Sequence, residues 1–150
     1  MPTSTKKSSR ADATSPEAGD EIRVPVRSEN DLVYARQQGR RLAESLGFSS
    51  SEATLVATAI SELARNIVSY AVRGEIVLSR THDRTRRGIT VIARDEGPGI
   101  ANVKLAMQEG YSTSGGLGLG LPGVRRIMDE FHIETEPGRG TTVTASKWGQ

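Results

Sequence analysis

The first half of the chain contains two stretches in which apolar residues recur every three to four positions, as they do on one face of an α-helix. The longer stretch follows three serines and a glutamate at 49–52, a pattern typical of a capping box. Its apolar stripe consists of Val56, Ile60, Leu63, Ala64, Ile67 and Ala71. We therefore predict an amphipathic helix that extends to about Ala71, is stopped by Gly74 and packs this stripe against the core.

A shorter helix is predicted before the long one. Asn30 and Asp31 are its alternative N-caps, because both side chains can accept a hydrogen bond from the first helical turn. The helix then extends to about Leu46, and Gly47 ends it, since glycine readily adopts the left-handed conformation that closes many helices. A third helix is predicted over 124–131.

Strands are predicted where polar and apolar residues alternate or where isoleucine and valine cluster. Glu21–Val26 alternates, and Pro25 favours an edge position, because proline lacks the N–H group of a sheet ladder. Four further strands are predicted at 75–80, 88–95, 132–135 and 141–147. The last two are joined at 136–140 by Glu-Pro-Gly-Arg-Gly, a turn by composition. Helices early in the chain and hairpin-like strands late in it indicate an α+β fold, a two-layer sandwich.

Composition divides the chain into two parts. Residues 1–20 contain no leucine, isoleucine, valine or aromatic residue, so we expect a disordered tail there and one domain over 21–150. The tail lacks the apolar segment of a secretory signal, and no run of the chain has the length needed to span a bilayer. The absence of cysteine excludes disulfides and thiolate metal sites, and these features together favour a cytoplasmic protein.

The basic residues are clustered, although the net charge is only +2. One cluster lies at 6–10, and the other lies at 80–87 between two predicted strands, where we expect a solvated hairpin loop. No aromatic residue is interleaved with the second cluster to stack on bases. We therefore expect neither nucleic acid nor a membrane as a partner.

The strongest chemical signal is a glycine-rich run, Ser-Gly-Gly-Leu-Gly-Leu-Gly-Leu at 114–121, just before the last predicted helix. Such a loop exposes backbone N–H groups at a helix N-terminus, where many proteins bind phosphate. A second glycine turn, Asp-Glu-Gly-Pro-Gly at 95–99, adds a carboxylate. We interpret the two turns as a nucleotide pocket and residues 100–115 between them as its lid, whereas either turn by itself is equally compatible with a flexible loop.

Glu62 and Asn66 are four residues apart in the long helix and therefore share a face, beside the apolar stripe. A carboxylate at the edge of the core can accept a proton from a hydroxyl group. An amide oxygen one turn further along can bind Mg²⁺, which prefers oxygen ligands and keeps substrate phosphates and waters. The spacing by itself favours the simpler interpretation, an ordinary polar helix face.

The glycine turns and the helical pair together resemble the nucleotide-binding boxes of the GHKL (Bergerat-fold) ATPase superfamily. The boxes are Glu62-x-x-x-Asn66, Asp95-x-Gly97-x-Gly99, Gly116-x-Gly118-x-Gly120 and Gly138-x-Gly140-Thr141. The resemblance covers about residues 20–147. The run from Ser112 to Val124, followed by Met-Asp-Glu-Phe at 128–131, closely resembles the RsbT-type serine/threonine kinases, which are small switch kinases of bacterial stress-response signalling.

This resemblance implies a fold and a role for the polar residues. The fold would be a mixed sheet with helices on one face, with ATP between the helices and the lid. Glu62 would be the general base, and Asn66 would hold Mg²⁺. Asp95 would accept a hydrogen bond from the adenine amino group, which selects adenine over guanine. Thr141 would support the adenine end of the site.

The glycines have two implied roles. Gly97 and Gly99 would let the chain pass close to the nucleotide. The phosphates would be lined by backbone N–H groups at Gly116, Gly118 and Gly120.

Other polar and aromatic residues are weaker candidates. Lys104 lies in the predicted lid, from which it could reach the γ-phosphate, and an ordinary exposed lysine is the equal alternative. Arg65 is expected to lie at the surface or form an ion pair rather than contact phosphate. His82 and His132 lack partners at metal-ligand spacing, and Trp148 is expected to cover the core or contact a partner.

Three functions remain to be compared. The leading one, implied by the resemblance, is an ATP-dependent kinase that phosphorylates serine or threonine on a STAS-domain antagonist and, once released, activates a PP2C-type phosphatase. The alternative is an anti-sigma factor that sequesters a sigma factor. A stand-alone histidine-kinase catalytic domain fits less well, because both histidines follow Glu62 and only the 16 residues at 100–115 separate the glycine turns.

Overall fold

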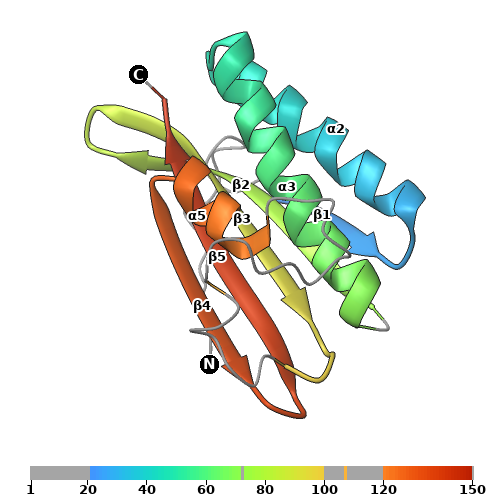
Figure 1. Ribbon diagram of the computed structural model, residues 1–150. Coiled ribbons are helices and arrows are strands. Elements are labelled where there is room, and N and C mark those ends of the chain that lie inside the picture. Colours follow the sequence, from blue (N-terminus) through green and yellow to red (C-terminus); the bar gives the residue numbers. More distant parts are fainter. Residues whose placement is uncertain (1–20, 72, 100–106, 108–119, 150) are drawn as a thin grey trace.

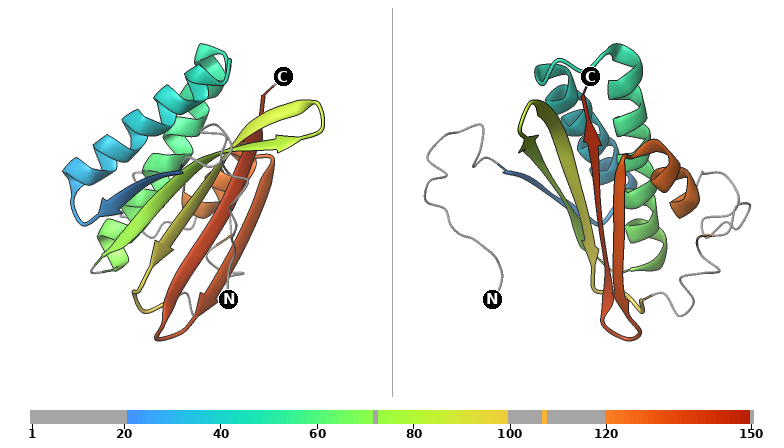
Figure 2. Two further views of the ribbon diagram at one scale, coloured as in Figure 1. Left: turned by 180° about the vertical axis from the view of Figure 1, so that it is seen from behind. Right: turned by 90° about the vertical axis from the view of Figure 1, so that its left-hand side faces the viewer.

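The computed structural model describes residues 21–71, 73–99, 107 and 120–149. They form a five-stranded sheet in the order β1-β2-β3-β5-β4, with helices packed against it (Figure 1). In chain order the elements are β1 (Glu21–Val26), α2 (Glu29–Ser45), α3 (Ser50–Tyr70), β2 (Gly74–Asp83), β3 (Arg86–Asp95), α5 (Gly120–Ile127), β4 (Glu130–Glu136) and β5 (Gly140–Trp148). Figure 2 shows the helix layer and the sheet from behind and from the side.

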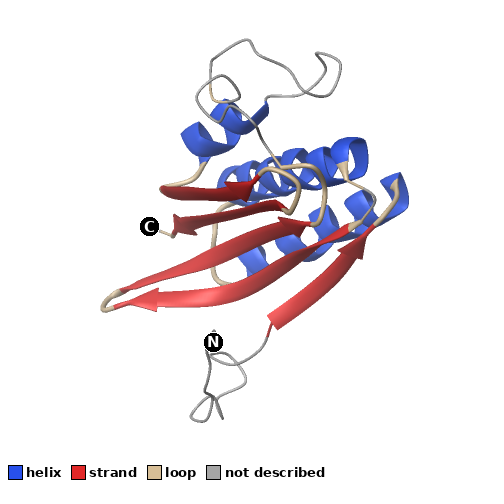
Figure 3. Cartoon of the chain, turned by 90° about the horizontal axis from the view of Figure 1, so that it is seen from below, coloured by secondary structure: helices blue, strands red, loops and turns tan. Residues whose placement is uncertain are grey.

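The two layers confirm the predicted α+β sandwich, because the three described helices all lie on one face of the sheet (Figure 3). The expectation of a mixed sheet was wrong for the described strands, since every neighbouring pair is antiparallel. Two of these pairs, β2–β3 and β4–β5, are hairpins with turns of two and three residues, and such short turns allow only antiparallel neighbours. β1, which contains Pro25, lies at an edge as predicted.

Helix α2 is capped by Ser28 and not by Asn30 or Asp31, so this prediction was wrong. The Ser28 hydroxyl accepts a hydrogen bond from the Asp31 N–H at 3.4 Å, and the Asp31 carboxylate accepts one from the Arg27 N–H at 2.9 Å. Asp31 thus takes part in the cap as an early helical residue rather than as the cap itself. Gly47 follows the helix with a φ of 88°, as predicted.

Helix α3 begins with the predicted capping box. The Ser49 N–H donates to the Glu52 carboxylate at 3.0 Å, and the Glu52 N–H donates to the Ser49 hydroxyl at 3.1 Å. The helix ends at Tyr70, four residues before Gly74. The prediction that Gly74 stops the helix was therefore wrong. Gly74 instead opens β2, where a Cβ atom would lie 2.3 Å from the carbonyl oxygen of Arg94 on β3.

The β2–β3 hairpin is longer than predicted. Pairing continues to Asp83 opposite Arg86, so most of the basic cluster at 80–87 lies in strands and only two residues form the turn. The expectation of a loop was wrong because charged residues can pair in strands at the solvated end of a hairpin. The Arg86 guanidinium lies over the ring of Trp148, 4.2 Å from its centroid, so Trp148 covers this end of the sheet.

Helix α5 extends over Gly120–Ile127. The predicted span of 124–131 was wrong at both ends, because the helix begins and ends earlier in the chain. Val124 is buried in the core. Phe131 belongs to β4, where it is paired with Ala145 of β5. Pairing along this sheet edge therefore determines where the helix must end.

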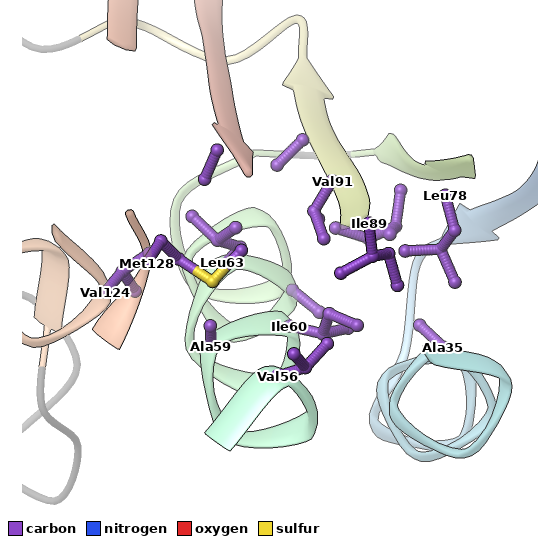
Figure 4. Packing of buried hydrophobic residues seen from close by; sticks show 14 of the residues in the cluster. Ala35, Val56, Ala59, Ile60, Leu63, Leu78, Ile89, Val91, Val124 and Met128 are labelled. Atoms are coloured by element: carbon purple, nitrogen blue, oxygen red, sulfur yellow. The ribbon is translucent and has the colours of Figure 1, made fainter. Parts of the chain in front are cut away.

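The core lies between α3 and the sheet (Figure 4). The predicted stripe of α3 is confirmed, since five of its six residues are buried and Ala71 packs partly buried against them. They face buried side chains of the sheet that include Leu78, Ile89 and Val91. Helix α2 packs close to α3, because a Cβ atom at Gly39 would lie 2.0 Å from Cδ1 of Ile60.

Some expectations fall outside the described residues. The tail at 1–20 lies there entirely, as does the lid at 100–115 except Met107, which packs partly buried against the core. Among the helices that are described, none combines the length and the hydrophobicity that a membrane span requires.

Candidate functional site

Glu62 lies on the side of α3 that contacts α5 and is only 6% exposed. Its Oε2 atom accepts a hydrogen bond from Nη1 of Arg65 at 2.8 Å, and its Oε1 atom accepts one from the backbone N–H of Gly120 at 3.2 Å. The second bond joins the middle of α3 to the first residue of α5, although 58 positions separate the two residues in sequence. The structure therefore places the predicted base beside Gly120, and the N–H group that was expected to line the phosphates donates to Glu62 instead.

Asn66 lies one turn beyond Glu62 on α3 and is half-buried. The helical spacing puts both side chains on one side of the helix. Arg65 forms the ion pair with Glu62, which is the ion-pairing role predicted for it, and its side chain is 30% exposed. This edge of α3 thus presents a carboxylate, a guanidinium and an amide at the boundary between core and solvent.

Asp95 forms the second part of the candidate site, at the end of β3. Its neighbours across the sheet are Gly74 on β2 and Thr141 on β5. The Oδ1 atom accepts a hydrogen bond from the Gly97 N–H at 2.9 Å, which orients the carboxylate. Asp95 and Thr141 are therefore direct partners in the sheet, an arrangement that suits a shared role at one end of a pocket.

Thr135 on β4 belongs to the same group but was not predicted. Its hydroxyl oxygen lies 2.9 Å from Oγ1 of Thr141, and it donates to the carbonyl oxygen of Gly140 at 3.2 Å. The predicted turn at 136–140 contained the necessary signal, because a hairpin places the residue before its turn opposite the residue after it.

A hollow of about 600 Å³ opens at this end of the sheet. Its lining includes Asp95, Ile133, Thr135, Thr141 and Arg139. Glu134 and Glu136 also line the hollow, so it combines an aliphatic side chain and hydroxyl groups with several carboxylates. The part formed by Ile133, Asp95 and Thr141 is suited to a ligand that has an apolar face and a polar edge, such as a purine base.

Gly97 and Gly99 are required by the packing of the loop that follows β3. A Cβ atom at Gly97 would lie 2.9 Å from Cβ of Ala71 at the end of α3. Gly99 has a φ of 80°, and a Cβ atom there would lie 2.6 Å from the carbonyl oxygen of Glu136. The loop is thus held between α3 and the β4–β5 turn. Its predicted closeness to the nucleotide stays a prediction, and the packing supplies an independent reason for glycine.

Helix α3 connects the two parts of the site, because it carries Glu62 and its end contacts the loop at Gly97. The remaining predicted site residues, Lys104, Gly116 and Gly118, lie outside the described residues. The described part of the site therefore consists of the α3–α5 junction and the ends of β3 and β5.

Comparison with known proteins identifies the family of the chain. Residues 24–147 match the family model of the histidine kinase-like ATPase domain. The chain is 49% identical over 129 residues to the serine/threonine-protein kinase RsbT of Bacillus subtilis, a match that covers 86% of this chain and 97% of that protein. It is 30% identical over 132 residues to an anti-sigma F factor of Caldanaerobacter subterraneus, covering 85% of this chain and 92% of the relative.

Solved structures share the fold. The RsbU and RsbW domains of Rv1364c from Mycobacterium tuberculosis match with a TM-score of 0.58 at 20% identity, over 87% of this chain and 33% of that one. The SiaB–SiaC complex from Pseudomonas aeruginosa matches with a TM-score of 0.54 at 14% identity, over 91% of this chain and 94% of that one. The chain therefore belongs to the histidine kinase-like ATPase family and, within it, to the group of RsbT-type serine/threonine-protein kinases.

Proposed function

We propose that this ATP-dependent protein kinase phosphorylates a serine or threonine of a STAS-domain antagonist, as the switch in a bacterial stress-response pathway based on partner exchange. The observation that carries the proposal is the contact between the Glu62 carboxylate and the Gly120 N–H. It puts a base next to the start of a helix, where backbone N–H groups favour phosphate. The likeness to RsbT supports the same assignment.

Glu62 accepts the proton of the acceptor hydroxyl in the proposed reaction. A carboxylate has about four lone-pair sites, and Arg65 and Gly120 use two of them, so Glu62 can still accept a third donor. As the proton moves to Glu62, the hydroxyl oxygen bonds to the γ-phosphorus, the bond from this phosphorus to the bridging oxygen breaks, and ADP leaves. A positioned base contributes about 10²–10⁴-fold to such a rate.

Asp95 provides the specificity for adenine. Its carboxylate accepts a hydrogen bond from the exocyclic amino group of adenine, whereas guanine has a carbonyl oxygen at that position. Thr141 lies beside it in the sheet, and Thr135 is within hydrogen-bond distance of Thr141. These hydroxyls support the base end of the pocket, and Gly97 holds the Asp95 carboxylate in place.

Asn66 is the proposed protein ligand of Mg²⁺. The described part of the chain contains no group of three or more histidine, cysteine, aspartate or glutamate side chains placed to hold a metal. Mg²⁺ is usually bound through one or two protein oxygens together with substrate phosphates and does not require such a group. When bound, Mg²⁺ offsets the negative charge of the phosphates, and Asn66 would orient it from α3.

The downstream partner in this proposal is a PP2C-type phosphatase, which the kinase activates once it is released from its antagonist. The resemblance to RsbT-type kinases supports this step. The fold itself is compatible with protein partners, since a chain of this fold occurs in the SiaB–SiaC complex. A cytoplasmic location, expected from the sequence, is part of the same proposal.

A second candidate function is sequestration of a sigma factor. It is favoured by relatives named anti-sigma F factor, which are 28–31% identical in Clostridium acetobutylicum, Geobacillus thermodenitrificans and two Thermoanaerobacter strains. Kinase activity would then only adjust which partner is bound.

Co-elution of the chain with candidate STAS-domain proteins, before and after incubation with Mg·ATP, distinguishes the two functions. A new phosphate adds about −1.5 to −2 charges beside a site that already holds an anionic nucleotide, so the complex is expected to dissociate. A STAS-domain protein that remains unmodified, together with a tightly bound sigma factor, would favour sequestration instead.

A further inference from the structure

Arg65 is the charged partner of a carboxylate that is almost removed from water. The side chain of Glu62 is 7% exposed and that of Arg65 is 30% exposed, with 2.8 Å between Nη1 and Oε2. Burying an ionised carboxylate is unfavourable unless a cation or several hydrogen-bond donors compensate for the lost water. Arg65 therefore supplies part of the compensation that a carboxylate buried at this place requires.

This pair differs from the other arginine–carboxylate pairs with helical or turn spacing. Arg86 and Asp83 are also three positions apart, but their side chains are 48% and 45% exposed. Arg40 and Glu44 on α2 are 40% and 51% exposed. Exposed pairs of this kind contribute little to a fold. In the Arg65–Glu62 pair, the Glu62 side chain is buried. Arg65 can therefore determine where the Glu62 carboxylate lies.

The Glu62 carboxylate is held from two directions. Arg65 binds it from within α3, and the Gly120 N–H binds it from the start of α5. Each donor takes a different oxygen atom, so rotation of the carboxylate breaks at least one bond. The two donors together fix the position of the Glu62 carboxylate at the α3–α5 junction. Its remaining lone pairs can accept a further hydrogen bond there.

We propose that Arg65 is a positioning residue for the phosphoryl transfer: it holds the Glu62 carboxylate at the α3–α5 junction, where the hydroxyl of the protein substrate meets it. The inference rests on the proposed function of Glu62. Arg65 acts through Glu62 and does not bind the nucleotide. Its loss therefore lowers kcat and leaves the affinity for ATP unchanged.

The test compares Arg65→Ala and Arg65→Lys with the wild-type chain. Arg40→Ala serves as the control, because it removes an exposed helical ion pair with Glu44 and an exposed hydrogen bond to Thr54 of α3. Four quantities are measured: kcat with a STAS-domain substrate, KM for ATP, the Kd for ATP by calorimetry, and the hydrogen-exchange rate of the Gly120 amide in the nucleotide-free chain. Thermal unfolding of each variant is recorded first. Arg65→Lys retains the charge, so the test does not depend on the alanine variant alone.

We expect Arg65→Ala to lower kcat about 10²-fold, the cost of a misplaced catalytic group. The Kd for ATP stays at the wild-type value, and the Gly120 amide exchanges faster. Arg65→Lys restores part of kcat, and Arg40→Ala resembles the wild type in all four measurements. A higher Kd for ATP in Arg65→Ala would show that Arg65 binds phosphate and would overturn the proposal, as would a wild-type kcat.

The exchange measurement separates this inference from the proposed function. If the wild-type chain phosphorylates no STAS-domain protein, the proposed function fails. Faster exchange of the Gly120 amide in Arg65→Ala would still support the positioning of Glu62 by Arg65, and unchanged exchange would overturn it.

Discussion

Replacing Gly140 with alanine is expected to destabilise the chain and to weaken ATP binding. Gly140 begins β5 with a φ of 131°, a conformation that residues with a side chain rarely adopt. The new Cβ atom would lie 2.1 Å from the carbonyl oxygen of Asp95. Because this oxygen belongs to the backbone, it cannot move away by a change of rotamer, so the residue proposed to bind adenine must shift.

The expected loss of stability has two parts. A residue with a side chain in a sparsely populated backbone conformation costs about 1–3 kcal/mol. An additional carbon atom in a closely packed place costs about 1–3 kcal/mol more. The free energy of unfolding should therefore fall by about 2–6 kcal/mol, a large share of the about 5–15 kcal/mol that is typical of natural domains.

Gly138→Ala is the matched control. Gly138 has a φ of 84° and lies two residues away in the same turn, but a Cβ atom there would have no other atom within 4 Å. Its substitution costs only the left-handed conformation, about 1–2 kcal/mol. Urea unfolding followed by circular dichroism measures both losses, and calorimetric titration measures the Kd for ATP of each folded variant.

If both substitutions lowered the free energy of unfolding equally, the contact with Asp95 would add nothing to the loss, contrary to this prediction. A folded Gly140→Ala variant with the ATP affinity of the wild type would show that the position of Asp95 does not control binding.

Three other substitutions test separate parts of the account. Glu62→Ala should slow phosphoryl transfer about 10²–10⁴-fold in single-turnover assays while ATP binding is largely retained, and a wild-type rate would exclude the base role. Asp95→Asn should lose most ATP affinity, because an amide can offer a donor where adenine requires an acceptor; equal binding of ATP and GTP by the wild type would contradict the adenine assignment. Leu63→Ala, at a position 2% exposed, should lower the free energy of unfolding by about 2–5 kcal/mol in urea, and a loss well below this range would contradict its place in the core.

The local signals of α3 were predicted well from the sequence, whereas the N-cap of α2 was not. The start of α3 follows from Ser49 and Glu52, which bond to each other across one turn. Its buried face follows from the spacing of residues such as Val56 and Ile60, which are fully buried. Both features depend on neighbours along the chain, so no knowledge of the tertiary structure was needed.

Boundaries that depend on distant partners were predicted less well. The end of α5 is determined by the pairing of Phe131 with β5, and the length of the β2–β3 hairpin by pairing as far as Asp83. Helical spacing and strand alternation do not contain this information, because the partner strand decides where an element ends.

The candidate site shows the same division. The motifs that contain Glu62 and Asp95 were visible in the sequence, whereas the contact of Glu62 with Gly120 joins residues 58 positions apart. To predict the contribution of Thr135, the register of β4 against β5 would also have been needed. Sequence patterns therefore identified the chemical groups, and the structure supplied their neighbours.

The most direct test of the central claim is a phosphoryl-transfer assay with γ-labelled ATP, Mg²⁺ and purified STAS-domain proteins of the same organism, with the modified residue mapped by mass spectrometry. We predict that the wild-type chain transfers label to one serine or threonine of one STAS-domain protein, and that Glu62→Ala does so at least about 10²-fold more slowly. If the chain binds ATP and a STAS-domain protein but transfers no label, or if Glu62→Ala transfers it at the wild-type rate, the account of the site is contradicted.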